Sequence, residues 1–274
     1  MSNLYVQALH VHPVKSVAGT APDEMAVEPW GLSGDRRWAV VDTEGTVITQ
    51  RQQPRLALAA ARPLGGGAVA LSAPGMAELA VEVPEPGPLE PVTLFGKKVE
   101  TVVAAGAAAD WFSTYLGVPA RLVHMDDPAV RRPVDPAYAL PGETVSLADA
   151  YPVLLVTLAS LDALNSLIAQ GDHPEEGPLP MNRFRPNVVV AGAEAWAEDG
   201  WRRIAIGDAV FRGVRECGRC IVTTTDQATA ERGKEPLKTL ARHRRIGKSL
   251  AFGRQLVPVR TGTVRVGDEV RILE

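Results

Sequence analysis

Residues 217–226 read Cys-Gly-Arg-Cys-Ile-Val-Thr-Thr-Thr-Asp, and this stretch holds both cysteines of the 274-residue chain. Two cysteines are too few to build a disulfide scaffold, so the pair needs another explanation. Residues 221–223 are β-branched, which is typical of a strand, and we expect a strand there. Cys217 and Cys220 are the sharpest chemical feature of the sequence.

Four interpretations of the cysteine pair are open from the residues alone. The cysteines are inert side chains at a strand end, or they form a thioredoxin-like redox pair, which needs a helix N-terminus rather than a strand. A zinc site needs a second pair of ligands, but the five histidines (10, 12, 124, 173 and 243) are scattered. In the fourth interpretation, one thiolate binds a metal whose other ligands belong to a cofactor.

Basic and hydroxyl-bearing residues recur at the ends of expected strands and at one expected helix start. Taken singly, each cluster is most simply solvated surface, and Ser160 is most simply a helix cap. Taken together, in a chain of net charge −3, they indicate a buried ligand with phosphate or carboxylate groups. The clusters are Lys15-Ser16, Asp35-Arg36-Arg37, Arg51 with Arg55, Thr157 with Ser160, and Arg183 with Arg185 and Asn187.

Composition narrows the classes of function. Hydrophobic residues make up 46% and charged residues 22% of the chain, as in globular proteins. The net charge of −3 argues against general nucleic-acid binding, which depends on basic residues. The N-terminus lacks a basic segment followed by an apolar one, and no apolar run approaches the ~20 residues that span a bilayer. We therefore expect a cytoplasmic protein with no nucleic-acid partner and no membrane partner.

Strand patterns dominate the chain, and the turns between them resemble those of hairpins. The first clear helix is expected over 107–116, closed by Gly117, and two more over 161–168 and 235–245. Four prolines between 126 and 142 indicate a linker. We expect a β-rich fold with a few helices, in which a smaller N-terminal β domain (1–125) packs on a C-terminal β-barrel (143–274).

Several segments, in the right order, resemble the signature of MOSC-domain proteins, the relatives of the molybdenum cofactor sulfurase C-terminal domain. The N-terminal half resembles the β-barrel-like domain that precedes it in the mitochondrial amidoxime-reducing component and its bacterial YcbX-type relatives. The matching segments of the MOSC half are 183–187, 217–226, 234–240, 252–253 and 266–268, and those of the N-terminal half are Tyr5, 13–16, 31–32, 35–36 and 50–56.

The resemblance implies a molybdenum cofactor, molybdopterin, bound between the two domains. It implies that Cys220 is the protein ligand of the metal and that Cys217 is accessory. The other cofactor contacts carried over are Lys15, Ser16, Arg36, Arg185 and Asn187, with Thr157 and Ser160 near the cofactor phosphate.

The activity implied by the resemblance is the two-electron reduction of N-hydroxylated compounds such as amidoximes and hydroxylamines. No cysteines beyond the pair are present to bind an iron–sulfur cluster, so we expect electrons from a separate ferredoxin, flavodoxin or cytochrome-type partner. Two alternatives stay open. One is a cofactor carrier or sulfurase-like sulfur-transfer module without its own turnover. The other is a thiol or zinc-binding protein that uses Cys217 and Cys220 equally.

Overall fold

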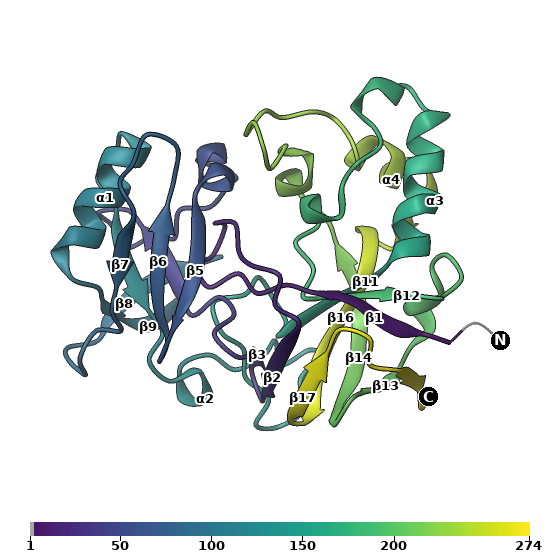
Figure 1. Ribbon diagram of the computed structural model, residues 1–274, viewed down its shortest axis with the longest axis horizontal. Coiled ribbons are helices and arrows are strands. Elements are labelled where there is room, and N and C mark those ends of the chain that lie inside the picture. The colour runs from purple at the N-terminus through teal and green to yellow at the C-terminus, as the bar shows by residue number, and fades with distance from the viewer. Residues whose placement is uncertain (1–2) are drawn as a thin grey trace.

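The computed structural model describes residues 3–274, and its regular structure is mainly β-strand, which confirms the expected fold class (Figure 1). The helices are α1 (Gly106–Leu116), α2 (Pro128–Arg131), α3 (Leu158–Ala169) and α4 (Leu237–His243). The strands are β1 (Tyr5–Leu9), β2 (Glu24–Glu28), β3 (Gly31–Leu32), β4 (Trp38–Val41), β5 (Ala60–Gly65), β6 (Ala68–Ser72), β7 (Leu79–Val81), β8 (Glu90–Leu94), β9 (Lys97–Val103), β10 (Arg121–His124), β11 (Val153–Thr157), β12 (Val188–Ala191), β13 (Arg203–Ile206), β14 (Ala209–Gly218), β15 (Arg245–Ile246), β16 (Ser249–Arg260), β17 (Gly262–Arg265) and β18 (Val270–Ile272).

The C-terminal half forms a nearly closed barrel. Its strands follow the order β1-β12-β11-β16-β14-β13-β18, and β15 adds to β16 as a short hairpin. The two ends of this sheet meet, because the amide of Val6 in β1 donates to Asp268 just before β18, at 2.9 Å. Fully buried side chains such as Leu155, Phe211 and Leu256 fill the interior. Their burial is the main stabilisation of the barrel.

The N-terminal half forms two smaller sheets, β4-β10-β9-β8 and β5-β6-β7, with α1 beside them (left in Figure 1). Helix α1 ends as expected at Gly117, whose φ of 71° is the left-handed conformation that favours glycine. Its buried face, with Phe112 at the centre, shares one core with Val40 and Leu71 of the two sheets. The half therefore has a hydrophobic core of its own.

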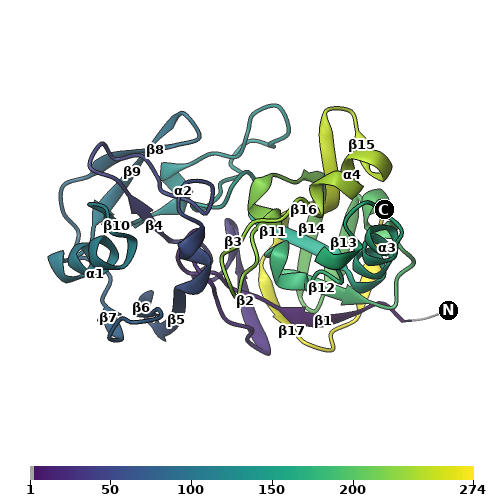
Figure 2. The ribbon, with the colours of Figure 1, turned by 90° about the horizontal axis from the view of Figure 1, so that it is seen from above.

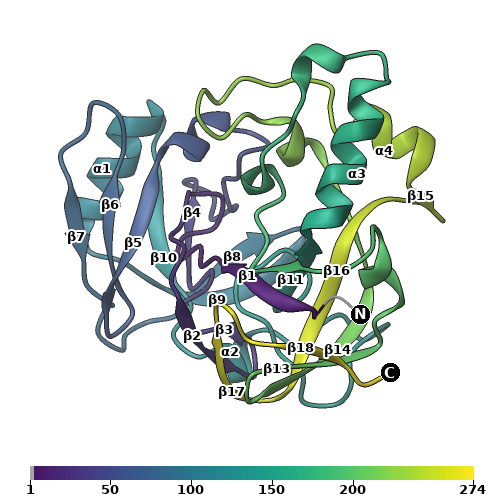
Figure 3. The same ribbon diagram turned by 45° about the vertical axis from the view of Figure 1, so that its right-hand side comes forward.

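The first three strands join the C-terminal half, although they come from the N-terminal end of the sequence. β1 runs antiparallel to β12, and β2 lies between β17 and β3 (Figure 3). Between β1 and β2 the chain touches the N-terminal sheets, where the amide of Lys15 donates to Trp38 of β4 at 2.8 Å, and after β3 it crosses to them through residues 33–37. Residues 126–142, the expected linker, connect β10 to β11 and contain α2. The two halves are thus joined by two crossings of the chain, seen from above in Figure 2.

The strand expected over 221–223 is wrong. These residues belong to a turn of 3-10 helix, η5 (Ile221–Thr224). The hydroxyl of Thr223 donates to the carbonyl of Cys220 at 2.9 Å, and that of Thr224 donates to Ile221 at 2.9 Å. Threonine hydroxyls that bond to nearby backbone groups favour turns over strands, and here this effect outweighs β propensity. Strand β14 therefore ends at Gly218, just before Cys220.

None of the helices in residues 3–274 combines the length and the apolar character needed to cross a bilayer.

Candidate functional site

A cleft opens where residues of both halves meet, next to the end of β14. Its empty volume is about 960 Å³, including the part open to solvent, which is in the range of small-molecule sites. Six of the eight cofactor contacts predicted from the sequence line it: Lys15, Ser16, Arg36, Arg185, Asn187 and Cys220. They come from the loops after β1, β3, η3 (Met181–Arg183) and β14, and the fold brings these loops together.

The cleft is strongly cationic, although the chain is weakly acidic. Five basic residues line it, and Asp149 is the single carboxylate among its lining residues. Such an excess of positive charge at one place in an acidic protein attracts anions and focuses their field. The five basic residues are Lys15, Arg36, Arg51, Arg185 and Arg219.

Lys15 and Asp149 form the central ion pair of the cleft. The ammonium group of Lys15 is buried, pairs with the Asp149 carboxylate and donates to the carbonyl of Leu147 at 2.9 Å. Burial lowers the pKa of Lys15 to about 8, and Asp149 offsets part of that shift. The Asp149 side chain is 58% exposed to the open cleft. Desolvation by the surrounding protein raises the pKa of Asp149. The charges of Lys15 and Arg51 outweigh this effect and hold the pKa well below its ordinary value.

Arg36 and Arg185 form a second pair of side chains, of like charge. Arg36 donates to the side-chain oxygen of Asn187 and to the carbonyl of Arg185, both at 3.1 Å, while Arg185 donates to the carbonyl of Val17 at 2.8 Å. Burial, and then the charge of Arg36, lowers the pKa of Arg185 to about 9. A bound anion would relieve this repulsion.

Asn187 holds the wall of the cleft together. Its amide nitrogen donates to His10 at 3.2 Å, and its amide oxygen accepts from Leu154 and Arg36. Because both ends of its amide already bond to other residues of the protein, Asn187 shapes the cleft by positioning Arg36.

Backbone strain is concentrated at the cleft. Ser16, Arg36 and Arg185 have φ angles of 67°, 48° and 53°, in the left-handed region that non-glycine residues rarely adopt. Across residues 3–274, six non-glycine residues have a positive φ, and these three are half of them. Strained residues of this kind cluster at ligand-binding sites, where the surrounding structure holds them in place.

The two cysteines occupy different environments in the same cleft. The Cys220 thiol is partly exposed and accepts a hydrogen bond from Arg51 at 3.2 Å. The Cys217 thiol is buried and accepts from Arg219 at 2.9 Å and from Gln255 at 3.5 Å. Burial raises the pKa of Cys217 despite the nearby Arg219. Of the two, Cys220 is the more accessible ligand for a metal.

Thr157 and Ser160, the other two predicted cofactor contacts, do not line the cleft. Both are fully buried, and both hydroxyls donate to Glu198, at 3.1 and 2.8 Å respectively. The hydroxyl of Thr157 also accepts from the amide of Ser160 at the start of α3, as a helix cap. We call these three residues the Glu198 corner. Both hydroxyls go to the same oxygen, Oε2, while the buried Oε1 of Glu198 has no partner among the described residues, and burial raises the pKa of Glu198.

Three further charged residues of the cleft were not among the predicted cofactor contacts. Arg51 follows β4 in a segment whose resemblance to the family was visible, and Arg219 lies between the cysteines. Asp149 has no sequence signal, since it lies in an irregular loop before β11. The buried Nε atom of Arg219 has no hydrogen-bond partner among the described residues, and the same holds for the Nε atoms of Arg212, Arg244 and Arg254 outside the cleft.

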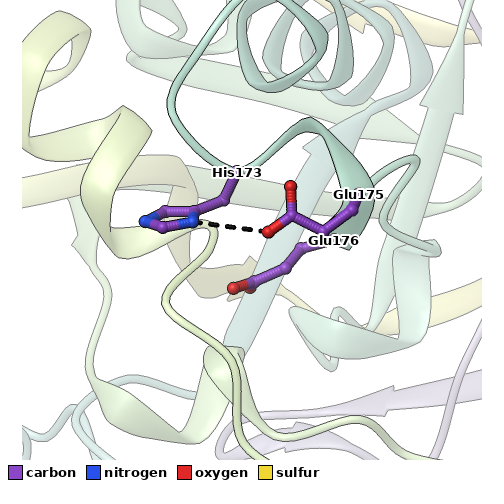
Figure 4. A group of neighbouring side chains, drawn as sticks. All are labelled: His173, Glu175 and Glu176. Atoms are coloured by element: carbon purple, nitrogen blue, oxygen red, sulfur yellow. Dashed lines mark ion pairs between the residues drawn. The ribbon is translucent and has the colours of Figure 1, made fainter.

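A cluster of His173, Glu175 and Glu176 lies away from the cysteines, on the loop after α3 (Figure 4). The donor atoms of these three residues lie within 4.8 Å of one another, and residues 3–274 contain no other such group of three or more potential metal ligands. However, the carboxylate of Glu176 already accepts from the amides of Lys234 and Glu235, at 2.8 and 2.9 Å. It anchors one loop to another. Neither cysteine belongs to the cluster, so the zinc interpretation of the cysteine pair gains no support.

Comparisons with known proteins identify the family of the chain. Residues 3–119 match the MOSC N-terminal beta barrel domain, and residues 142–271 match the MOSC domain. The chain is 35% identical to the human mitochondrial amidoxime-reducing component 1, across 98% of this chain and 82% of the relative. It is 34% identical to the rat mitochondrial amidoxime reducing component 2 and 32% identical to component 1 of Xenopus laevis, across 97% of this chain in each case and 82% and 81% of the relatives. The chain therefore belongs to the MOSC-domain family, in the two-domain form shared with the amidoxime-reducing components.

Proposed function

We propose that this protein is a molybdenum-cofactor-dependent oxidoreductase that reduces N-hydroxylated compounds. One observation carries the proposal. The accessible thiol of Cys220 lies in a cleft that is lined by five basic residues and a single carboxylate, between the two domains of a MOSC protein. Its relatives are named for amidoxime reduction, which favours the same substrate class here.

The residues of the cleft fit a phosphate-bearing metallopterin. Molybdenum favours soft thiolate ligands, which Cys220 supplies. The ionised oxygens of a phosphate suit guanidinium groups, and Arg36, Arg185 and Arg219 supply them. The strained backbone of Arg185 supports a ligand-binding role, because such strain is found at sites that hold a ligand. When bound, the cofactor would supply the redox-active metal centre.

The residues of the chain would bind and orient the reactants. Lys15, Arg36 and Arg185 would hold the anionic cofactor, and Cys220 would bind its metal. Arg51 donates to the Cys220 thiol at 3.2 Å and so would orient this ligand. Asp149 is ionised and faces the open part of the cleft, where it can accept a hydrogen bond from a substrate N–H or O–H group.

The overall reaction balances with two electrons and two protons. The N–O bond of an amidoxime breaks, and the products are an amidine and water. We propose that the electrons come from a separate ferredoxin, flavodoxin or cytochrome-type protein. The two cysteines of the chain cannot hold an iron–sulfur cluster of four thiolate ligands.

The two single cysteine variants test the proposal. We expect Cys220→Ala to lose molybdenum and benzamidoxime reduction with an artificial electron donor, whereas Cys217→Ala keeps most of both. Equal loss in the two variants would favour a thiol or zinc-binding protein. A wild-type protein that holds molybdenum and pterin but turns over no N-hydroxylated compound would be a cofactor carrier, and would contradict the proposed activity.

A further inference from the structure

The turn between β8 and β9 carries an aromatic side chain where the backbone disfavours one. Phe95 and Gly96 have φ angles of 51° and 78°. A two-residue hairpin turn with both φ values positive favours Asn-Gly, because Asn tolerates the left-handed conformation and a bulky residue does not. The turn between β5 and β6 instead places glycine at its three positive-φ positions, 65–67. The β8–β9 turn is therefore strained by the choice of phenylalanine.

The strained side chain is also exposed. Half of the Phe95 surface, 50%, is accessible to solvent. A single exposed apolar residue is ordinary on a protein surface. An exposed aromatic residue that also strains its own backbone is unusual, because neither hydrophobic burial nor turn geometry favours it. Strain of this kind is found where a side chain contacts a ligand.

Phe95 lies at the edge of the cleft. Its ring centre is 4.9 Å from the guanidinium carbon of Arg51 and 5.1 Å from the ammonium nitrogen of Lys15. Arg51 in turn donates to the thiol of Cys220. Arg51 thus contacts both the Phe95 ring and Cys220, the proposed metal ligand.

A second hollow adjoins the cleft on this side. Its volume is about 720 Å³, including space open to solvent, and it shares Arg51 with the cleft. Val47, Leu94 and Phe95 give it an apolar surface, whereas the cleft around Cys220 is dominated by charge. Its floor is fixed, because Thr93 of β8 exchanges backbone hydrogen bonds with Gly45 and Val47, at 2.7 and 3.0 Å. A rigid apolar wall beside a polar reaction centre is the usual division of a substrate site.

We propose that this hollow, with Phe95 as its wall, is the subsite for the aromatic or apolar body of an N-hydroxylated substrate. The inference rests on the proposed function. It adds that the N-hydroxyl group points past Arg51 into the cleft, while the body of the substrate packs on the Phe95 ring. The protein should therefore prefer aryl amidoximes over hydroxylamine, which has no body to bind.

Phe95→Asn is the sharpest test, because it removes the ring and installs the residue that the turn favours. The variant should fold, with a melting temperature equal to or above that of the wild type. We expect its KM for benzamidoxime to rise roughly tenfold, with unchanged molybdenum content and unchanged kcat/KM for hydroxylamine. Phe95→Tyr keeps the ring and should keep the low KM. Leu64→Asn, at an exposed apolar position outside both hollows, is the matched control.

A binding measurement separates this inference from the proposed function. Saturation-transfer NMR reports contact between the protein and the ring protons of benzamidoxime, whether or not the compound is reduced. A signal that is strong in the wild type and weak in Phe95→Asn supports the subsite, even if the protein proves inactive. An active enzyme whose KM and NMR signal are unchanged by Phe95→Asn would overturn the subsite and leave the proposed function standing. If the protein is inactive and the wild type and Phe95→Asn give equal NMR signals, both the subsite and the proposed function are overturned.

Discussion

The cleft and the Glu198 corner both gather polar side chains at the edge of the barrel, yet their electrostatics are opposite. The cleft has five basic residues against one carboxylate, and it includes a buried guanidinium nitrogen without a partner. In the Glu198 corner, two hydroxyls donate to one carboxylate, and the corner is closed to solvent. The cleft holds an excess of positive charge, although Asp35 pairs with Arg36 and Asp149 with Lys15, whereas the Glu198 corner gathers two hydroxyls around one carboxylate.

The difference separates a binding role from a structural one. An excess of charge of one sign destabilises a protein on its own, so its presence argues for a ligand that neutralises it. Matched hydroxyls and a carboxylate stabilise the start of a helix and need no ligand. Variants in the two places should therefore fail in different ways.

The largest effect is expected from Arg185→Gly in the cleft. Removing one charge-assisted contact should weaken cofactor retention by about 10- to 100-fold, since such contacts contribute roughly 1.5–3 kcal/mol. The free energy of unfolding should change little. The lost hydrogen bond to Val17 is offset because glycine adopts the φ of 53° without strain and because the repulsion from Arg36 disappears. Pterin content and chemical denaturation measure the two quantities.

Arg121→Ala provides the control for Arg185→Gly, because Arg121 pairs with Glu90 in the N-terminal sheet, outside the cleft. It should retain the pterin. Equal pterin content in both variants would remove Arg185 from the binding site.

In the Glu198 corner, Ser160→Ala should give the opposite result. It leaves a buried carboxylate with one donor fewer and should lower the free energy of unfolding by about 1–3 kcal/mol. Cofactor content should not change. Ser166→Ala is the matched control, because Ser166 lies on the exposed side of α3 and bonds only to its own helix, at Asp162. A Ser160→Ala protein that is stable but empty of pterin would restore Ser160 to the binding site.

The smallest effect concerns the pH dependence of stability in the same corner. Burial raises the pKa of Glu198 in the folded state, so folding favours its protonated form. Its contribution is fully present below the pKa of the unfolded chain and is lost as pH rises through the folded pKa. Glu198→Gln should therefore unfold with a flatter dependence on pH from about pH 4 upward than the wild type, as measured by denaturation at several pH values. A curve parallel to that of the wild type would show that Glu198 is not the group responsible.

The sequence predicted the cleft better than it predicted the local structure. Lys15, Arg36 and Arg185 stood out as basic residues at strand ends, the family resemblance assigned them to the cofactor, and all three line the cleft. The turn at Ile221–Thr224 was missed, because β propensity does not register the hydroxyl bonds that only a turn permits.

Other features depend on tertiary contacts that no local pattern carries. Asp149 enters the cleft only because residues 126–152 return from the N-terminal sheets to the barrel. Thr157 and Ser160 have the composition of an anion site, but Glu198, some forty residues away in the chain, occupies their hydroxyls. The pairing of β1 with β12 likewise joins residues 5–9 to residues 188–191, far apart in the sequence.

The metal and pterin content of the protein tests the central claim most directly. The protein would be produced in a host that makes molybdenum cofactor, and the molybdenum, zinc, iron and pterin per chain would be measured for the wild type and Cys220→Ala. We predict one molybdenum and one pterin per wild-type chain, with molybdenum lost from Cys220→Ala. Zinc in place of molybdenum, or neither metal nor pterin, would contradict the account. The cationic cleft would then be a site for a different anionic ligand.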